Sequence, residues 1–414
     1  MNREKPAHGA FWKKYFSRDI LVYGGVEAAF WSAFTAVVFL STALADSGFS
    51  GAQTGTIMAV RNVVGMVATA VVANWTDKIG SPRRMMLLCA SVAAILTALI
   101  PAAFGVKLFG TSLGVILIFV SAFFNSPMYG LCESWVVQAA DRKKTFSYGS
   151  ARYFGSFFYA IVCIGYGALA KRLGGHGFTF YAFGILCVPL LLLAIYTKRD
   201  EPKERVVRPR GTFGLRRLVK NYYFLTFLAC YTLSSIPMQG LMTFLSYKLL
   251  ELNGSTNAMG ALTALRSFAE IPSLILCAAW IKKAGLKKTY LAVIGGFGLV
   301  QMLLFAARGM ALVTAALFLI GFVNGAYMVC QIRYVHAVTP PEARASGVSL
   351  CVSASMISGV LANLCGGFLT QRFSTNAYFL FGALCAALSA AMLVLCGPVG
   401  NRLGFAPPDL DGEG

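Results

Sequence analysis

Long apolar runs separated by short polar segments dominate the pattern of this chain. The runs are about 20 residues long, which is the length that an α-helix needs to cross the hydrocarbon core of a membrane. We therefore predict an all-α membrane protein with twelve transmembrane helices. The predicted spans are 20–45, 53–75, 84–105, 109–139, 149–170, 176–197, 222–247, 256–281, 289–307, 311–335, 346–370 and 376–397.

The composition supports this prediction and narrows the protein class. Of the 414 residues, 57% are hydrophobic and 13% are charged, which excludes disorder, a disulfide scaffold and an ordinary soluble enzyme. The net charge of +20 could indicate binding to nucleic acid, but the charges lie between the apolar spans, which makes this explanation the poorer one. With both termini in the cytoplasm, 27 of the 36 Lys and Arg residues face the cytoplasm and 6 lie in the opposite loops. The positive-inside rule thus predicts a multi-pass protein of the inner (plasma) membrane, with lipid as a partner and no nucleic acid.

A basic segment divides the predicted spans into two sets of six. It covers residues 198–221 and contains nine basic residues, so we expect a cytoplasmic linker between an N-terminal bundle at 1–197 and a C-terminal bundle at 222–414 with a short cytoplasmic tail. An offset of 205 residues superposes Arg61 on Arg266, and it also superposes Trp75 on Trp280 and Gly80 on Gly285. Parallel six-span repeats occur in many secondary transporters, where the substrate site lies at the repeat interface near the midplane.

The cysteines and histidines do not indicate a metal centre. All eleven cysteines fall within predicted spans and are interpreted as small apolar packing residues. The three histidines, His8, His176 and His336, are scattered and lack the spacing of zinc ligands. We therefore predict no metal and no cofactor apart from a proton as coupling ion.

Six charged residues lie deep inside predicted spans. Each costs about 2.5–3.5 kcal/mol at a helix centre on insertion scales, so we expect these side chains to face a cavity or one another. Arg266 and Glu270 are four residues apart and can pair directly, whereas Glu27 must find a partner on another helix. Some of these six charged side chains could instead only hold neighbouring helices together, and this alternative stays open. The six residues are Glu27, Glu133, Glu270, Arg61, Arg152 and Arg266.

Helical spacing predicts which polar and aromatic residues share a face with these charges. Such stripes suit a neutral polar solute with an apolar face, although hydrogen bonding between helices explains any single member about as well. The stripes are Tyr23, Glu27, Phe30, Trp31 and Phe34 in the first span, Asn125, Tyr129 and Glu133 in the fourth, Tyr231, Ser235 and Gln239 in the seventh, and Asn324, Tyr327 and Gln331 in the tenth.

The loop after the second span resembles the signature of the major facilitator superfamily. The segment 73–84, Ala-Asn-Trp-Thr-Asp-Lys-Ile-Gly-Ser-Pro-Arg-Arg, matches its order of acid, glycine and basic residues, although Ala73 replaces the leading glycine. The resemblance implies two pseudo-symmetric six-helix bundles. It also implies a gating role for Asp77, Gly80, Arg83 and Arg84, because an acid at a helix end beside basic residues forms a polar latch.

A narrower resemblance points to the lactose permease-like branch, which contains oligosaccharide, nucleoside and phenylpropionate proton symporters. The residues that carry it lie at 124–133, 148–155 and 269–272. The resemblance implies substrate binding by Glu133 and Arg152, with the ring of Tyr159 stacking on the solute, and a coupling role for Glu270. The branch's proton-handling His and Glu have no counterpart between 311 and 335. Glu270 is therefore the favoured proton carrier, with Glu27 close behind.

These observations predict a monomeric, alternating-access transporter that is not an enzyme. We expect it to import a small polar solute, with a sugar or nucleoside favoured, together with protons. A proton-driven exporter of amphipathic compounds, a facilitative uniporter and a non-transporting sensor stay open as alternatives. A membrane enzyme is disfavoured because no catalytic acids, histidines or metal ligands converge.

Overall fold

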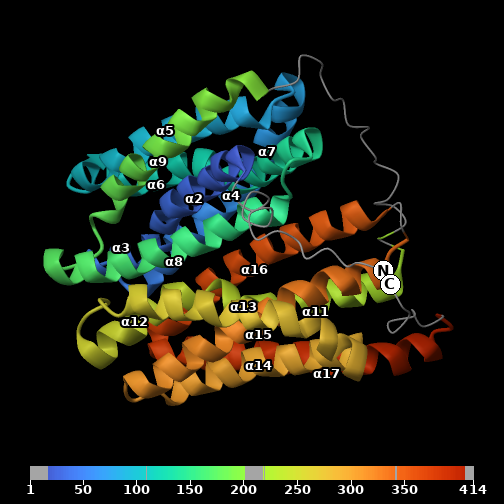
Figure 1. The fold of residues 1–414 in the computed structure, drawn as a ribbon. Helices are drawn as coiled ribbons and strands as arrows, with labels where there is room; N and C mark the ends of the chain where they lie inside the picture. Colours follow the sequence, from blue (N-terminus) through green and yellow to red (C-terminus); the bar gives the residue numbers. More distant parts are fainter. Residues whose placement is uncertain (1–16, 109, 201–217, 219, 341–342, 406–414) are drawn as a thin grey trace, which may run out of the picture. The chain divides into compact units, whose positions relative to one another are not determined.

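The computed structural model describes residues 17–108, 110–200, 218, 220–340 and 343–405, and helices dominate it (Figure 1). The first part contains α2 (Arg18–Val38), α3 (Leu40–Asp46), α4 (Gly51–Ile79), α5 (Pro82–Ala103), β1 (Lys107–Leu108), β2 (Thr111–Ser112), α6 (Leu113–Asn125), α7 (Met128–Lys143), α8 (Tyr148–Leu173), α9 (Thr179–Tyr196) and the 3-10 helix η1 (Thr197–Asp200). The second part contains α11 (Tyr222–Gln239), α12 (Leu241–Asn253), α13 (Met259–Ala284), α14 (Leu286–Ala306), α15 (Met310–Val338), α16 (Arg344–Arg372) and α17 (Thr375–Arg402).

The helices confirm the predicted all-α membrane fold. Within the described residues, 11 helices are long and apolar enough to cross a membrane, and α13 raises the number to 12 when its two bent segments count as one span. The two segments of α13, Met259–Leu274 and Leu276–Ala284, meet at an angle of 49°. Pro272 lies just before this bend and removes one helical hydrogen bond in the preceding turn. Large apolar side chains such as Ile95 and Ile185 are 64% and 69% exposed, which suits contact with lipid.

The helix ends show local chemistry that fixes the span boundaries. Ser81 accepts a hydrogen bond from the backbone N–H of Arg84 at 3.1 Å and so caps α5. Gly80 and Gly285 follow α4 and α13, and both have a positive φ, at +73° and +85°. These two glycines occupy matching positions in the predicted 205-residue repeat. A residue without Cβ is favoured at both turns because of the positive φ.

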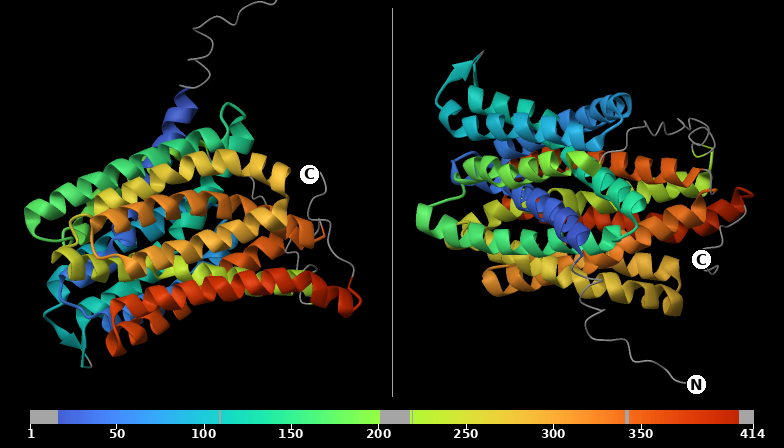
Figure 2. Two further views of the ribbon diagram at one scale, coloured as in Figure 1. Left: turned by 90° about the horizontal axis from the view of Figure 1, so that it is seen from below. Right: turned by 45° about the horizontal axis from the view of Figure 1, so that its top comes forward.

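Contacts divide the chain into two compact units. Unit 1 comprises residues 1–40 and 64–208, and unit 2 comprises residues 41–63 and 209–414. In unit 1, α2 packs on α8 and α9, while α5 packs on α6, α7 and α9. A hairpin of two strands with two residues each joins α5 to α6. Its strands, β1 and β2, pair antiparallel and are drawn as short arrows in Figure 2.

In unit 2, α13 packs on α15, α14 packs on α15 and α17, and α11 packs on α16 and α17. Segment 41–63 joins this unit through polar contacts. The Thr54 and Tyr247 hydroxyls lie 2.5 Å apart, the Tyr247 hydroxyl donates to the Phe49 carbonyl at 2.7 Å, and Thr256 donates to Asp46 at 2.6 Å. The close approach of α4 to α16 requires Gly55, because a Cβ at this position would overlap the Asn363 carbonyl oxygen.

The predicted linker at 198–221 lies largely outside the described residues. The division into bundles at 1–197 and 222–414 stays a prediction, as do the cytoplasmic positions of the termini.

Candidate functional site

Three of the six predicted intramembrane charges meet inside unit 1. The Arg152 Nε on α8 lies 3.4 Å from Glu133 Oε1 on α7, and its Nη1 lies 4.0 Å from Glu27 Oε2 on α2. The Glu27 side chain is fully buried, whereas those of Glu133 and Arg152 are 22% and 27% exposed. The Arg152 guanidinium thus lies beside two carboxylates. The cluster is exposed on the side of Glu133 and Arg152 and buried at Glu27.

Glu27 is the acid with the weaker contacts. Neither of its carboxylate oxygens has a hydrogen-bond partner of acceptable geometry in the part of the chain that the structure describes. Glu133, by contrast, accepts a hydrogen bond from the Tyr148 hydroxyl. The predicted partner of Glu27 on another helix is therefore Arg152, and it is shared with Glu133.

An aromatic group covers the same guanidinium. The Arg152 Cζ lies 4.1 Å from the ring centroid of Trp31, a cation–π distance. Trp31 makes edge-to-face contacts with Tyr129 and Tyr159, each at a centroid distance of 5.8 Å. Tyr159 therefore lies beside the cluster through its contact with Trp31. The ring that packs against the guanidinium is that of Trp31.

Glycines allow α2 and α8 to approach closely enough for these contacts. A Cβ at Gly155 would lie 2.6 Å from Trp31 Cδ1, 2.9 Å from Arg152 Nη1 and 3.3 Å from Glu27 Oε2. A Cβ at Gly24 would lie 2.7 Å from the Phe154 ring. Gly155 therefore provides the space in which the acid, the base and the indole meet.

Tyr148 is a member of this cluster that the sequence reasoning missed. It lies four residues before Arg152 on α8, so the two side chains share one helical face, and both contact Glu133. The spacing of four residues was the signal that could have identified it.

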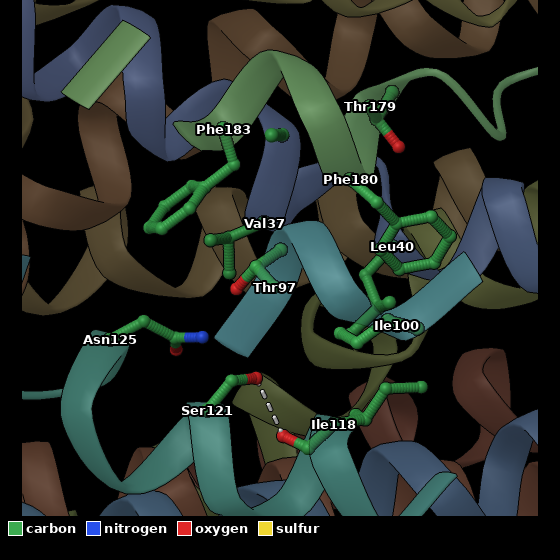
Figure 3. A pocket seen from close by; sticks show the side chains of 11 residues that line it. Val37, Leu40, Thr97, Ile100, Ile118, Ser121, Asn125, Thr179, Phe180 and Phe183 are labelled. Carbon is green, nitrogen blue, oxygen red and sulfur yellow. Dashed lines mark hydrogen bonds between the residues drawn. The ribbon is translucent and has the colours of Figure 1, made fainter. Parts of the chain in front are cut away.

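Asn125, the first member of the predicted fourth-span stripe, is the last residue of α6 and is followed by a break in the helix. α6 ends at Asn125 and α7 begins at Met128, with Pro127 between them, so residues 125, 129 and 133 do not continue on one regular helix. Asn125 is 4% exposed. It lines a small pocket among α2, α5, α6 and α9, where Thr97 and Ser121 also lie (Figure 3).

In unit 2, Glu270 contacts an amide rather than a base. The Asn324 Nδ2 on α15 donates to Glu270 Oε2 on α13 at 3.1 Å. Within the described residues, Arg266 and Glu270 do not lie within 4.0 Å of each other, so the direct pairing expected from their spacing is wrong in this structure. The physical reason is the close approach of α15, which brings Asn324 to the carboxylate.

Two glycines four residues apart produce that approach. A Cβ at Gly321 would overlap the backbone carbonyl of Arg266, and a Cβ at Gly325 would lie 2.6 Å from the backbone oxygen of Glu270. Small residues at this spacing let transmembrane helices pack with their backbones in contact. Asn324 lies between these glycines on α15, and its hydrogen bond to Glu270 shows that its side chain reaches α13.

The other predicted binding residues of unit 2 are mostly buried. The Tyr231 and Tyr327 rings are stacked with centroids 5.6 Å apart, and they are 5% and 6% exposed. The hydroxyl oxygen of Tyr327 lies 2.8 Å from that of Ser235. Gln239 donates a hydrogen bond to Ser355 and is exposed. Tyr231 and Tyr327 thus lie together in the bundle interior, and their role in binding stays a prediction.

The predicted gating residues lie at the junction of α4 and α5. Arg83 is 5% exposed, and its Nη1 donates to the Ala194 carbonyl at 2.6 Å, which ties the start of α5 to the end of α9. Asp77 and Arg84 are exposed. Arg61, the remaining predicted coupling residue, is half-buried on α4 in segment 41–63. The gating and coupling roles of these residues stay predictions.

The fold is that of a helical membrane protein with many spans, and comparisons with known proteins identify its family. The model of the MFS_1 like family matches residues 29–381, so the chain belongs to this family of the major facilitator type. It is therefore an integral membrane protein of a transporter family, and its relatives are transporters rather than enzymes.

Several individual proteins are similar to this chain. The uncharacterized transporter YwbF of Bacillus subtilis (strain 168) is 24% identical over 345 residues, which cover 83% of this chain and 84% of that protein. The maltose permease of Geobacillus stearothermophilus is 23% identical over 374 residues, covering 84% and 87%. Among solved structures, the nucleoside transporter NupG shares the fold with a TM-score of 0.73 at 14% identity, covering 92% of this chain and 98% of that one. A bacterial homolog of the human lysosomal transporter Spinster, in an inward-facing and unoccupied conformation, has a TM-score of 0.60 at 14% identity, covering 93% and 96%.

Proposed function

We propose that this protein imports a small polar solute, with a sugar or nucleoside favoured, by alternating access coupled to protons. The observation that carries the proposal is the shared position of Arg152 between Glu27 and Glu133, with Trp31 against its guanidinium. The proposal includes a monomer in the inner membrane, with both termini in the cytoplasm, no metal and no cofactor other than the coupling proton.

The substrate class follows from the donors and acceptors around Arg152. A carboxylate accepts hydrogen bonds from hydroxyl groups, and a guanidinium donates them in a fixed fork geometry. Rings such as Trp31 and Tyr159 give an apolar surface for a sugar ring face or a base. A maltose permease and a nucleoside transporter among the similar proteins support this choice of solutes.

We assign the coupling role to Glu27 before Glu270. Glu27 is fully buried and its carboxylate lacks hydrogen-bond partners of acceptable geometry in the described chain, so binding a proton would remove a poorly compensated charge. Glu270 already accepts a hydrogen bond from Asn324. A protonated Glu27 would no longer attract Arg152, which would then be held by Glu133 alone and be available to the solute.

The test uses a weakly buffered suspension of cells that express the protein. Sugars and nucleosides are added one at a time while the external pH is recorded, and cells that express the Arg152→Gln variant serve as the control. We expect a transient alkalinisation with one solute class and none in the control. Uptake of that class without any pH change would contradict proton coupling and indicate a uniporter. Absence of uptake with every solute, combined with resistance to amphipathic compounds, would contradict import and indicate an exporter.

A further inference from the structure

Two cysteines face each other across α13 and α15 in unit 2. The Sγ atoms of Cys277 and Cys330 lie 3.8 Å apart, and both side chains are fully buried. The Cys277 thiol also lies 3.5 Å from the Ala326 carbonyl oxygen, to which it donates. The glycines that hold α13 against α15, Gly321 and Gly325, lie one to three turns before Cys330 on the same helix.

We propose that Cys277 and Cys330 form a binding site for one soft monovalent cation of the Cu⁺ and Ag⁺ class. Thiolate sulfur is the donor that such ions prefer. The described part of the chain contains no group of three or more His, Cys, Asp or Glu side chains placed to hold a metal ion, so the pair offers two ligands. A structural zinc ion requires four ligands, whereas soft monovalent ions accept two.

The geometry needs only a small adjustment. With metal–sulfur bonds of about 2.3 Å, as found for zinc thiolates, a linear arrangement would place the sulfurs about 4.6 Å apart. The observed separation of 3.8 Å would have to widen by about 0.8 Å, which rotation of one thiol about its χ1 angle can supply. Each sulfur comes from a different helix, so the bound ion would link α13 to α15.

The charges also balance. Two neutral thiols and one monovalent cation give a bis-thiolate complex with a charge of −1 and release two protons. Arg333 lies on α15 three residues after Cys330, so its positive charge lies within one helical turn of this cysteine. The complex and this guanidinium together are neutral, which lowers the cost of forming the complex inside the bundle.

The experiment titrates the purified full-length protein in detergent with Ag⁺ in the presence of a competing thioether. Bound silver is counted by native mass spectrometry, and released protons are measured in weak buffer. We expect the wild type to bind the first Ag⁺ with two protons released per ion. The Cys277→Ser and Cys330→Ser variants should bind it at least about 100-fold more weakly, with one proton released per ion.

Cys351→Ser is the matched control, because Cys351 is also fully buried in unit 2 but lies on α16. This variant should retain the wild-type affinity and both protons. Silver should raise the melting temperature of the wild type and of Cys351→Ser only. The melting transition of each protein without silver reports that it is folded. Wild-type affinity and two released protons in either Cys277→Ser or Cys330→Ser would overturn the proposal.

Discussion

The two units place an acid inside an apolar helix bundle in different ways. In unit 1, Glu27 is fully buried, lies 4.0 Å from Arg152 and shares that base with Glu133. In unit 2, Glu270 accepts a hydrogen bond from the neutral amide of Asn324. In unit 1, the carboxylates are stabilised by ionic attraction to one shared base, so their contacts change when a group gains or loses a charge. In unit 2, the carboxylate of Glu270 is stabilised by a hydrogen bond from one neutral donor.

This difference indicates where a proton would have the larger effect. Protonation of one carboxylate in unit 1 would convert two acids and one base into a neutral ion pair plus a neutral acid. In unit 2, the Asn324 amide carries both a donor and an acceptor, so it can hydrogen-bond either form of Glu270. We therefore expect perturbations in unit 1 to affect transport and those in unit 2 to affect mainly stability.

The largest effect is expected from removal of the shared base. Arg152→Gln removes the guanidinium that Glu27 and Glu133 share and that the proposed site offers to the solute. A guanidinium can donate two hydrogen bonds in fork geometry, and each hydrogen bond to a charged group is worth about 1.5–3 kcal/mol. Uptake of the solute identified in the pH assay should fall at least about 100-fold, because each 1.4 kcal/mol corresponds to about tenfold. Arg172→Gln, on the exposed end of the same helix, is the control and should transport normally. Equal uptake by the two variants would contradict the assigned role of Arg152.

A smaller effect is expected from crowding the same cluster. In Gly155→Ala the new methyl group would overlap Trp31 Cδ1 at 2.6 Å and Arg152 Nη1 at 2.9 Å, which displaces both side chains. Misplacement of binding groups by about 1 Å can cost about 100-fold, so we expect uptake to fall by about tenfold or more. Gly165→Ala lies on the same helix, where a Cβ would meet nothing within 4 Å, and should transport like the wild type. The comparison is made by initial uptake rates at matched protein levels, and similar rates for both variants would be inconsistent with a packed cluster.

In unit 2, the expected change is in stability. Gly325→Ala places a methyl group 2.6 Å from the Glu270 backbone oxygen, so α13 and α15 must separate. Overpacking of this kind costs about 1–3 kcal/mol and should lower the melting temperature of the purified protein. Gly295→Ala on α14 has open space at its Cβ and is the matched control. A melting temperature of Gly325→Ala equal to that of Gly295→Ala would show that the close helix contact is absent.

The smallest effect is expected at the tyrosine stack. Tyr327→Phe keeps the ring contact with Tyr231 but removes the hydrogen bond between the Tyr327 and Ser235 hydroxyls. The loss should be about 1 kcal/mol of stability, with less than about a threefold change in uptake. Thermal unfolding and uptake assays on the same preparation would check both values. A loss of uptake as large as that of Arg152→Gln would instead place Tyr327 in the solute site.

The spans were predictable because hydrophobic length is a strong signal in membrane proteins. The matching positions of Arg61 and Arg266 also predicted a repeat, and the positive φ angles of Gly80 and Gly285 agree with that register. The breaks at Pro127 and Gly240 were not predicted, since a break inside an apolar run leaves the hydropathy pattern unchanged.

The site was predicted in part. An acid deep in a span needs a partner, so Glu27 was expected to find one on another helix, and the structure supplies Arg152. The pairing of Arg266 with Glu270 was wrong because the spacing along one helix contains no information on a neighbouring helix. The glycines at 321 and 325 determine that Asn324 contacts Glu270 instead.

A comparison of two variants in proteoliposomes determines whether Glu27 carries the coupling proton. Proteoliposomes containing Glu27→Gln or Glu270→Gln are assayed for solute accumulation driven by a pH gradient and for solute exchange at equal pH. We predict that Glu27→Gln retains exchange but loses accumulation, because a permanently neutral side chain cannot release a proton. Glu270→Gln should retain both. Accumulation by Glu27→Gln at the wild-type level, or its loss in Glu270→Gln alone, would show that Glu27 does not carry the coupling proton.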